Sequence, residues 1–99
     1  MLLGNYFTNI DNSKKNFFFS GISFNSKDIK KDNIFFAIKG NHFDGNKFIS
    51  TAIKKGSKII ISEKRITNFQ KNILFIRTEN IRKLLAEIAF KIYKNKPNN

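Results

Sequence analysis

The chain has 99 residues, which suits a single domain over residues 1–99. It carries 19 Lys and Arg residues against 7 Asp and Glu residues, so its net charge is +12, and it contains no cysteine. This composition excludes disulfide bonds, a thiolate nucleophile and a cysteine-based zinc site. One histidine and three glutamates also disfavour a metal site built from histidine and carboxylate ligands, and we predict none.

Apolar runs in the chain are only a few residues long, so we expect no membrane-spanning segment and no membrane partner. The first stretch, MLLGNYFTNIDNSKK, lacks the basic start and long apolar run of a secretory signal. The expected location is therefore cytoplasmic.

The positive charge allows two interpretations. A basic nucleic-acid-binding module would use it to neutralise phosphates. However, the 16 lysines are scattered, they far outnumber the 3 arginines, and Asn, Ile and Phe are overused with them. Codons for these residues are AT-rich, so compositional bias explains the charge without a ligand. We favour this second interpretation, and nucleic-acid binding stays as the weaker alternative.

Seven segments have the composition or periodicity of regular structure. In chain order they are a short helix over 2–8, strands over 17–24 and 34–39, a helix over 45–55, strands over 57–63 and 73–77, and a final helix whose apolar stripe runs from Ile81 to Ile92. Thr78 is the predicted N-cap of the final helix, with Glu79 in its first turn. The core is expected over about 17–94, and the tail 95–99 has the character of a linker.

Strand–helix–strand order with short loops predicts an α/β fold. We expect a small mixed or mainly parallel sheet of about four to five strands with packed helices. Asp44 stands where an N-cap of the 45–55 helix would be, and Gly56 is placed as its C′ residue. Gly40 is expected to support a sharp turn or a positive φ.

Motifs of catalysis are missing. The stretch GNHFDGNK has glycines at 40 and 45, but Asn46 follows the second glycine where a phosphate-binding P-loop needs lysine. No GxGxxG occurs, and one histidine near Asp44 does not make a Ser-His-acid arrangement. We predict no catalytic residue in this chain.

Two loops nevertheless have the residues of a ligand site. FNS (24–26) follows one predicted strand and GNHF (40–43) follows the next, and ligands of open α/β sheets bind at the carboxyl ends of strands. Phenylalanine faces with short polar groups suit a flat heterocycle. The alternative is a solvated His42 and a Phe43 folded back onto the core.

An ordered set of motifs resembles the N-terminal domain of Mur ligases. It runs through ISFNSKDIKKDNIFFAIKGNHFDGNKFISTAIKKGSKIIISE and the closing ENIRKLLAEIAFKIYKNKPNN, and the likeness covers about residues 20–97. The matching positions are Ser26, Phe35, Ala37, Gly40, Asp44, Gly45, Phe48 and Ala52. The branch that it looks most like is the tripeptide synthetase.

The chain also departs from the family pattern. Asn25 and Lys27 replace the usual Asp and Arg around Ser26. Asp32 and Asn33 stand where Gly-Asp is usual, and Asn46 replaces the histidine after Asp-Gly.

The resemblance implies a Mur ligase N-terminal-like fold and a division of labour. The first domain of the family holds the uridine end of UDP-N-acetylmuramoyl-L-alanyl-D-glutamate, a central domain binds ATP and magnesium, and a third receives diaminopimelate or lysine. The product serves peptidoglycan synthesis, and through it cell shape and division. The family's uridine-binding positions fall on Phe24, Ser26, Asn41, His42 and Phe43.

The resemblance also implies what this chain lacks. It stops where the family continues into its ATP-binding loop, so we expect a truncated or excised first domain whose partners are the remaining ligase domains. Such a chain binds no cofactor and is not a competent ligase by itself. The neighbouring branch, which adds the D-alanyl-D-alanine dipeptide, is the alternative within the family.

Overall fold

The computed structural model describes residues 1–8, 10–65 and 72–95. Its centre is a four-stranded sheet in the order β1-β2-β3-β4. The strands are β1 (Gly21–Ser23), β2 (Asn33–Ala37), β3 (Ile59–Ser62) and β4 (Leu74–Arg77). Every neighbouring pair is parallel. The predicted α/β class and four strands are confirmed, and the sheet is wholly parallel rather than mixed among the described residues.

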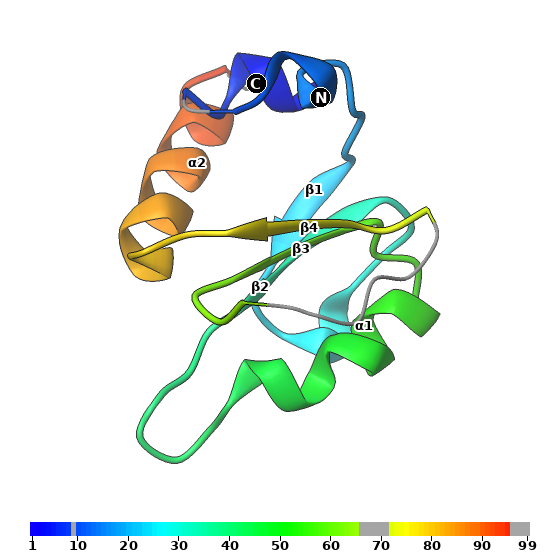
Figure 1. Cartoon of the computed structure of the whole chain (residues 1–99), viewed down its shortest axis with the longest axis vertical. Helices are drawn as coiled ribbons and strands as arrows, with labels where there is room; N and C mark the ends of the chain where they lie inside the picture. Colours follow the sequence, from blue (N-terminus) through cyan, green and yellow to red (C-terminus); the bar gives the residue numbers. More distant parts are fainter. Residues whose placement is uncertain (9, 66–71, 96–99) are drawn as a thin grey trace.

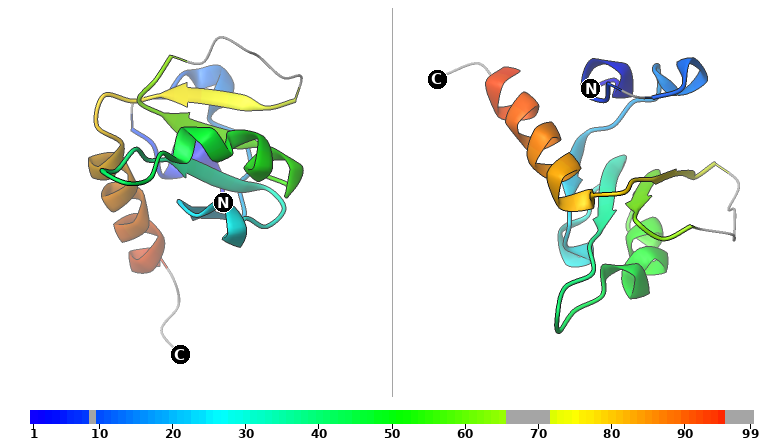
Figure 2. Two further views of the ribbon diagram at one scale, coloured as in Figure 1. Left: turned by 90° about the horizontal axis from the view of Figure 1, so that it is seen from below. Right: turned by 60° about the vertical axis from the view of Figure 1, so that its left-hand side comes forward.

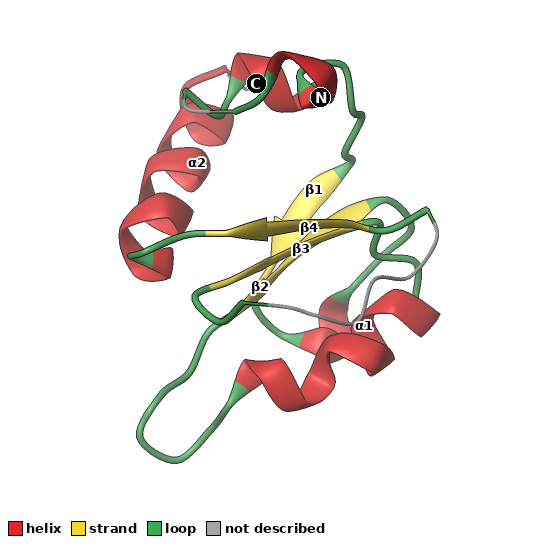
Figure 3. Ribbon diagram, in the orientation of Figure 1, coloured by secondary structure: helices red, strands yellow, loops and turns green. Residues whose placement is uncertain are grey.

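Two helices cover opposite faces of this sheet (Figures 2 and 3). Helix α1 (Ile49–Lys54) follows the 3₁₀ turn η4 (Gly45–Phe48), and α2 (Ile81–Asn95) follows β4. Shorter 3₁₀ turns are η1 (Leu3–Asn5), η2 (Asn12–Lys14) and η3 (Ser26–Asp28). The predicted 45–55 helix is therefore two pieces, a 3₁₀ turn that continues into an α-helix.

Side chains of β2 alternate between two hydrophobic clusters. Phe35 and Ala37 pack with Ile60 and Ala52 on the α1 face. The opposite cluster contains Ile34 and Phe36 of β2, Ile59 and Ile61 of β3, and Ile81 and Ile88 of α2. A strand whose side chains are buried on both faces reads as a continuous apolar run, as IFFA does.

The N-terminal segment closes the α2 face of the core. Leu3, Tyr6 and Phe7 are buried there, so the core begins earlier than residue 17. The Lys91 ammonium on α2 donates to the Tyr6 carbonyl at 2.9 Å. Figure 1 shows the blue N-terminal segment beside the end of α2.

The strand predicted over 17–24 is shorter than expected. Its first half pairs with the N-terminus instead of the sheet, because Leu3 N–H donates to the Phe17 carbonyl and Phe19 N–H to the Met1 carbonyl. Only Gly21–Ser23 joins β2. The predicted 2–8 helix is likewise reduced to the single turn η1.

The predicted cap of α2 was wrong. Thr78 still follows the path of β4, because its N–H donates to the Ser62 carbonyl at 3.0 Å. Asn80 caps the helix instead, since its Oδ1 accepts from Lys83 N–H at 3.1 Å. Glu63, in the loop after β3, accepts from Ile81 N–H at 2.9 Å and also binds the first turn.

Backbone turns close the amino end of the sheet. Gly56 follows α1 with φ +117°, which confirms it as a C′ residue, and its carbonyl accepts from Asp32 N–H at 2.8 Å. Asp32 itself has φ 66°. This left-handed conformation favours glycine and tolerates aspartate, which accounts for Asp32 at a position where the resembled pattern has glycine.

In the described part of the chain, no helix is both long enough and apolar enough to cross a membrane. Most of the predicted loop 65–72 and of the tail 95–99 lies outside the described residues.

Candidate functional site

Two loops leave the sheet at the same edge. Phe24 comes directly after β1, and the loop over 38–44 comes directly after β2. Because β1 and β2 are parallel neighbours, their carboxyl ends lie side by side. The loop after β2 extends well beyond the sheet before it enters η4 (Figure 1).

This extended loop is closed by backbone hydrogen bonds at its base. Gly40 N–H donates to the Phe43 carbonyl at 2.6 Å, and Gly45 N–H donates to the Ile38 carbonyl at 2.8 Å. A β-carbon on Gly45 would lie 2.8 Å from Ile38 N, so only glycine fits this crossing. Gly40 makes the predicted sharp turn, but it is not among the described glycines with positive φ.

Side chains at the loop base form a hydrogen-bonded network. The Asp44 carboxylate accepts from the Asn46 backbone N–H at 3.0 Å and from Asn46 Nδ2 at 2.8 Å, which confirms Asp44 as an N-cap. Asn46 Oδ1 in turn accepts from the hydroxyl of Ser62, a fully buried residue at the end of β3. Asn46 thus ties the loop to the strand after it.

Asp44 is the charged member of this network. Two hydrogen bonds from Asn46, and then the Lys64 ammonium 3.4 Å away, hold the pKa of the Asp44 carboxyl below its ordinary value of 3.8. Asp44 therefore stays ionised while it holds the start of η4.

Phe43 is held by a ring stack. Its ring lies 5.2 Å from that of Phe48, nearly parallel at 9°, yet it remains 50% exposed. Phe48 itself packs against the core cluster on the α1 face, so the alternative of a Phe43 folded back onto the core is met in part. The exposed part of Phe43 lines a groove.

Phe24 and Phe43 line one groove of about 470 Å³, where Phe24 is 60% exposed. The remaining lining residues come from the end of β2 and from α2: Ile38, Gly40, Arg82, Leu85, Ala86 and Ala89. The two loops singled out by the sequence therefore meet, and helix α2 forms the third wall.

The other predicted site residues are placed differently. Asn41 and His42 are exposed on the loop after β2, next to Phe43, but they do not line the groove. Ser26 is only 5% exposed in η3 and does not line the groove either. The structure thus places two of the five predicted residues in one groove, whereas Asn41 and His42 lie on the same loop as Phe43 and Ser26 is buried in η3.

The sequence interpretation missed the contribution of α2. Arg82, Ala86 and Ala89 recur at intervals of four and three residues, so they share one helical face next to the apolar stripe. A cation followed by small residues on this face was a usable signal. Whether this helical face lines a site depends on which strand ends the helix packs against, and local sequence does not show that.

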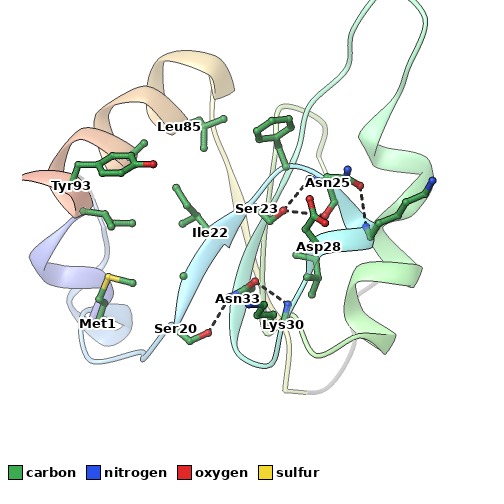
Figure 4. Close-up of a pocket in the computed structure, with 16 residues that line it drawn as sticks. Met1, Ser20, Ile22, Ser23, Asn25, Asp28, Lys30, Asn33, Leu85 and Tyr93 are labelled. Carbon is green, nitrogen blue, oxygen red and sulfur yellow. Dashed lines mark hydrogen bonds between the residues drawn. The ribbon is translucent and has the colours of Figure 1, made fainter. Parts of the chain in front are cut away.

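A larger groove of about 980 Å³ runs along the outer edge of β1. Figure 4 shows Leu85 and Tyr93 of α2 on one side of it and Ile22 of β1 on the other. Several of its polar side chains are engaged with one another or with the backbone: Asn33 Nδ2 donates to Ser20, and Asn25 Oδ1 accepts from Lys27 N–H. Only Phe24 of the predicted site residues lines it. We therefore assign the candidate site to the smaller groove.

In the described ranges, no three His, Asp or Glu side chains are grouped closely enough to hold a metal ion. The loop 40–47 also lacks the lysine of a phosphate-binding P-loop. The residues that line the candidate groove include no carboxylate and no histidine.

Comparison with known proteins agrees with the resemblance seen in the sequence. The family described as "Mur ligase family, catalytic domain" matches residues 19–93. The chain is 47% identical over 76 residues to the UDP-N-acetylmuramoyl-L-alanyl-D-glutamate–2,6-diaminopimelate ligase of Clostridium tetani, which is 75% of this chain and 16% of that protein. It is 36% identical over 91 residues to the ligase of the same name from Rickettsia prowazekii, 92% of this chain and 18% of that protein.

A solved structure shows the same fold. It is the UDP-N-acetylmuramoylalanyl-D-glutamyl-2,6-diaminopimelate–D-alanyl-D-alanyl ligase from Acinetobacter baumannii, with a TM-score of 0.63 over 77% of this chain and 16% of that one, at 21% identity. The chain thus spans less than a fifth of the length of these proteins. From the matched family and the two relatives, we conclude that the chain belongs to the Mur ligase family.

Proposed function

We propose that this chain is the part of a Mur ligase that binds the uridine end of a UDP-N-acetylmuramoyl-peptide substrate. The observation that carries the proposal is the groove between Phe24 and Phe43 at the carboxyl ends of two adjacent parallel strands. Apart from one arginine, its lining is apolar or glycine. Such a surface suits the face of a pyrimidine ring.

The loop residues would contact different parts of the base. Phe43 is pre-oriented by its stack on Phe48, so little freedom is lost when a base stacks on it. The exposed side chains of Asn41 and His42 provide hydrogen-bonding groups beside this ring for the polar edge of uracil. Ser26 is buried in the η3 turn that follows Phe24, so the present geometry gives it no direct contact with a ligand in the groove.

The reaction proposed for the whole ligase is addition of the third residue to UDP-N-acetylmuramoyl-L-alanyl-D-glutamate in peptidoglycan synthesis. The two relatives named above, at 47% and 36% identity, support this branch. We expect ATP and magnesium to bind to other parts of such a ligase. The branch that adds D-alanyl-D-alanine is the second candidate, and the Acinetobacter baumannii structure supports it at the level of fold alone.

A titration with UDP, followed by backbone amide NMR, tests the binding role. We expect shifts at residues 24–26 and 41–43 at millimolar ligand. Phe43→Ala should weaken binding about 5- to 100-fold, because stacking of one base on an aromatic ring is worth about 1–3 kcal/mol. Phe90→Ala is the matched control, since Phe90 is 66% exposed on α2 and lines neither groove. The proposal fails if UDP shifts none of these amides or if both variants bind equally.

A further inference from the structure

Arg82 is the one charged side chain that lines the candidate groove. The other seven lining residues are phenylalanine, aliphatic or glycine. Its guanidinium Nη2 lies 3.7 Å from the position that a β-carbon on Gly40 would take. The cation therefore reaches from the first turn of α2 to the loop that carries Phe43.

The fold does not explain a cation at this place. Among the described residues, Lys64 and Asp44 form an ion pair, but Arg82 forms none, because no carboxylate of these residues lies within 4.0 Å of it. Glu79, three residues earlier, is therefore not paired with Arg82. Arg82 also lies near the N-terminus of α2, where the partial positive charge of the helix makes a cation unfavourable. Its side chain contributes nothing evident to stability.

The groove as a whole has the chemistry of a two-part ligand. Two aromatic rings and a floor of alanine and isoleucine suit a flat, largely apolar group. A guanidinium at the side of such a surface suits an anion that is joined to that group, because its planar donors match phosphate oxygens. The net charge of +12 draws anions toward the molecule as a whole, but only Arg82 is placed in the groove.

We infer that Arg82 binds the diphosphate of a uridine nucleotide whose base lies on Phe24 and Phe43. This inference rests on the proposed function and extends it, because it assigns the anionic half of the ligand to a residue of α2. The first turn of that helix is positioned by Glu63 and Asn80, which bind Ile81 N–H and Lys83 N–H. Arg82 is thereby carried on a fixed helix end rather than on a loop.

The test compares uridine with UDP on three proteins: the unchanged chain, Arg82→Gln and Lys83→Gln. Lys83 is the matched control because it is the next residue on α2, is exposed and lines a different hollow. Removal of a charged hydrogen bond is worth about 10- to 100-fold in affinity. We expect Arg82→Gln to weaken UDP binding by about that factor and to leave uridine binding within about twofold. Lys83→Gln should change UDP binding by less than about threefold, because a charge outside the binding groove contributes little to affinity.

The outcomes separate the inference from the proposed function. If the unchanged chain binds neither uridine nor UDP, the proposed function fails. If uridine binds at the Phe43 loop but Arg82→Gln leaves UDP affinity unchanged, the assignment of the diphosphate to Arg82 is wrong. Equal loss of uridine and UDP would place Arg82 against the base instead of the phosphates, and this also overturns the inference. Arg82→Lys provides a further check, because an ammonium restores charge without the planar fork and should recover only part of the UDP affinity.

Discussion

Phenylalanines in two neighbouring regions have opposite environments. In β2, Phe35 and Phe36 are fully buried, one on each face of the sheet. At the carboxyl edge of the same sheet, Phe24 and Phe43 are 60% and 50% exposed. The first pair stabilises the fold through burial, whereas the second pair leaves apolar surface in contact with water.

Exposure alone does not mark a binding site. Phe17, Phe18 and Phe90 are also exposed, and single apolar side chains on a surface are ordinary. Phe24 and Phe43 differ because they come from two separate loops and line one groove with α2. The comparison teaches that convergence of exposed rings, rather than exposure itself, carries the functional argument.

The largest loss of stability should come from substitution of the buried phenylalanines of β2. Phe36→Ala is expected to lower the free energy of unfolding by about 3–5 kcal/mol, because it leaves a cavity between the sheet and α2. Phe24→Ala should lower it by less than about 1 kcal/mol, since the ring already contacts water. Urea unfolding monitored by circular dichroism measures both values. Similar losses for the two variants would remove the distinction between the regions.

The loop base should give the next largest effect. Asn46→Ala removes the acceptor of the buried Ser62 hydroxyl, and we expect a loss of about 1–3 kcal/mol in the free energy of unfolding. Asn41→Ala is the control within the same loop, because Asn41 is exposed and should change stability by less than about 0.5 kcal/mol. The same urea experiment applies. Stability unchanged by Asn46→Ala would mean that the network does not hold the loop.

Phe43→Ala tests how much an exposed phenylalanine contributes to stability. Loss of the stack on Phe48 should lower the free energy of unfolding by about 0.5–1.5 kcal/mol. This is far less than the effect of Phe36→Ala, although the same atoms are removed. A stability loss as large as that of Phe36→Ala, measured by thermal or urea unfolding, would show that Phe43 is a core residue.

The smallest effect concerns pH. The folded-state pKa of Asp44 is lowered, so its carboxylate contributes stability that is present above about pH 3.8 and is lost as the pH falls through the folded-state pKa. Asp44→Asn keeps a side-chain oxygen that can cap η4 but does not titrate. The difference in unfolding free energy between the two proteins should therefore shrink between about pH 5 and pH 2. A constant difference over this range would contradict the charged role of Asp44.

Several local features followed from short stretches of sequence. The run IFFA predicted a strand buried on both faces, the spacing of Asp44 before Gly45 predicted a cap, and Gly56 predicted the end of a helix. Each depends on backbone preference or on a hydrophobic period within about ten residues. The meeting of the two loops also followed, because parallel neighbours place their carboxyl ends at one edge.

The tertiary structure decided what local pattern could not. Of the 17–24 segment, only Gly21–Ser23 joins the sheet, because Phe17 and Phe19 pair with residues 1–3, far from β2 in sequence. Helix α2 becomes a wall of the groove because Glu63, eighteen residues before Ile81, binds its first turn. The sequence by itself thus determined the strand ends and the two aromatic loops, whereas long-range hydrogen bonds and packing decided that Arg82 would face them.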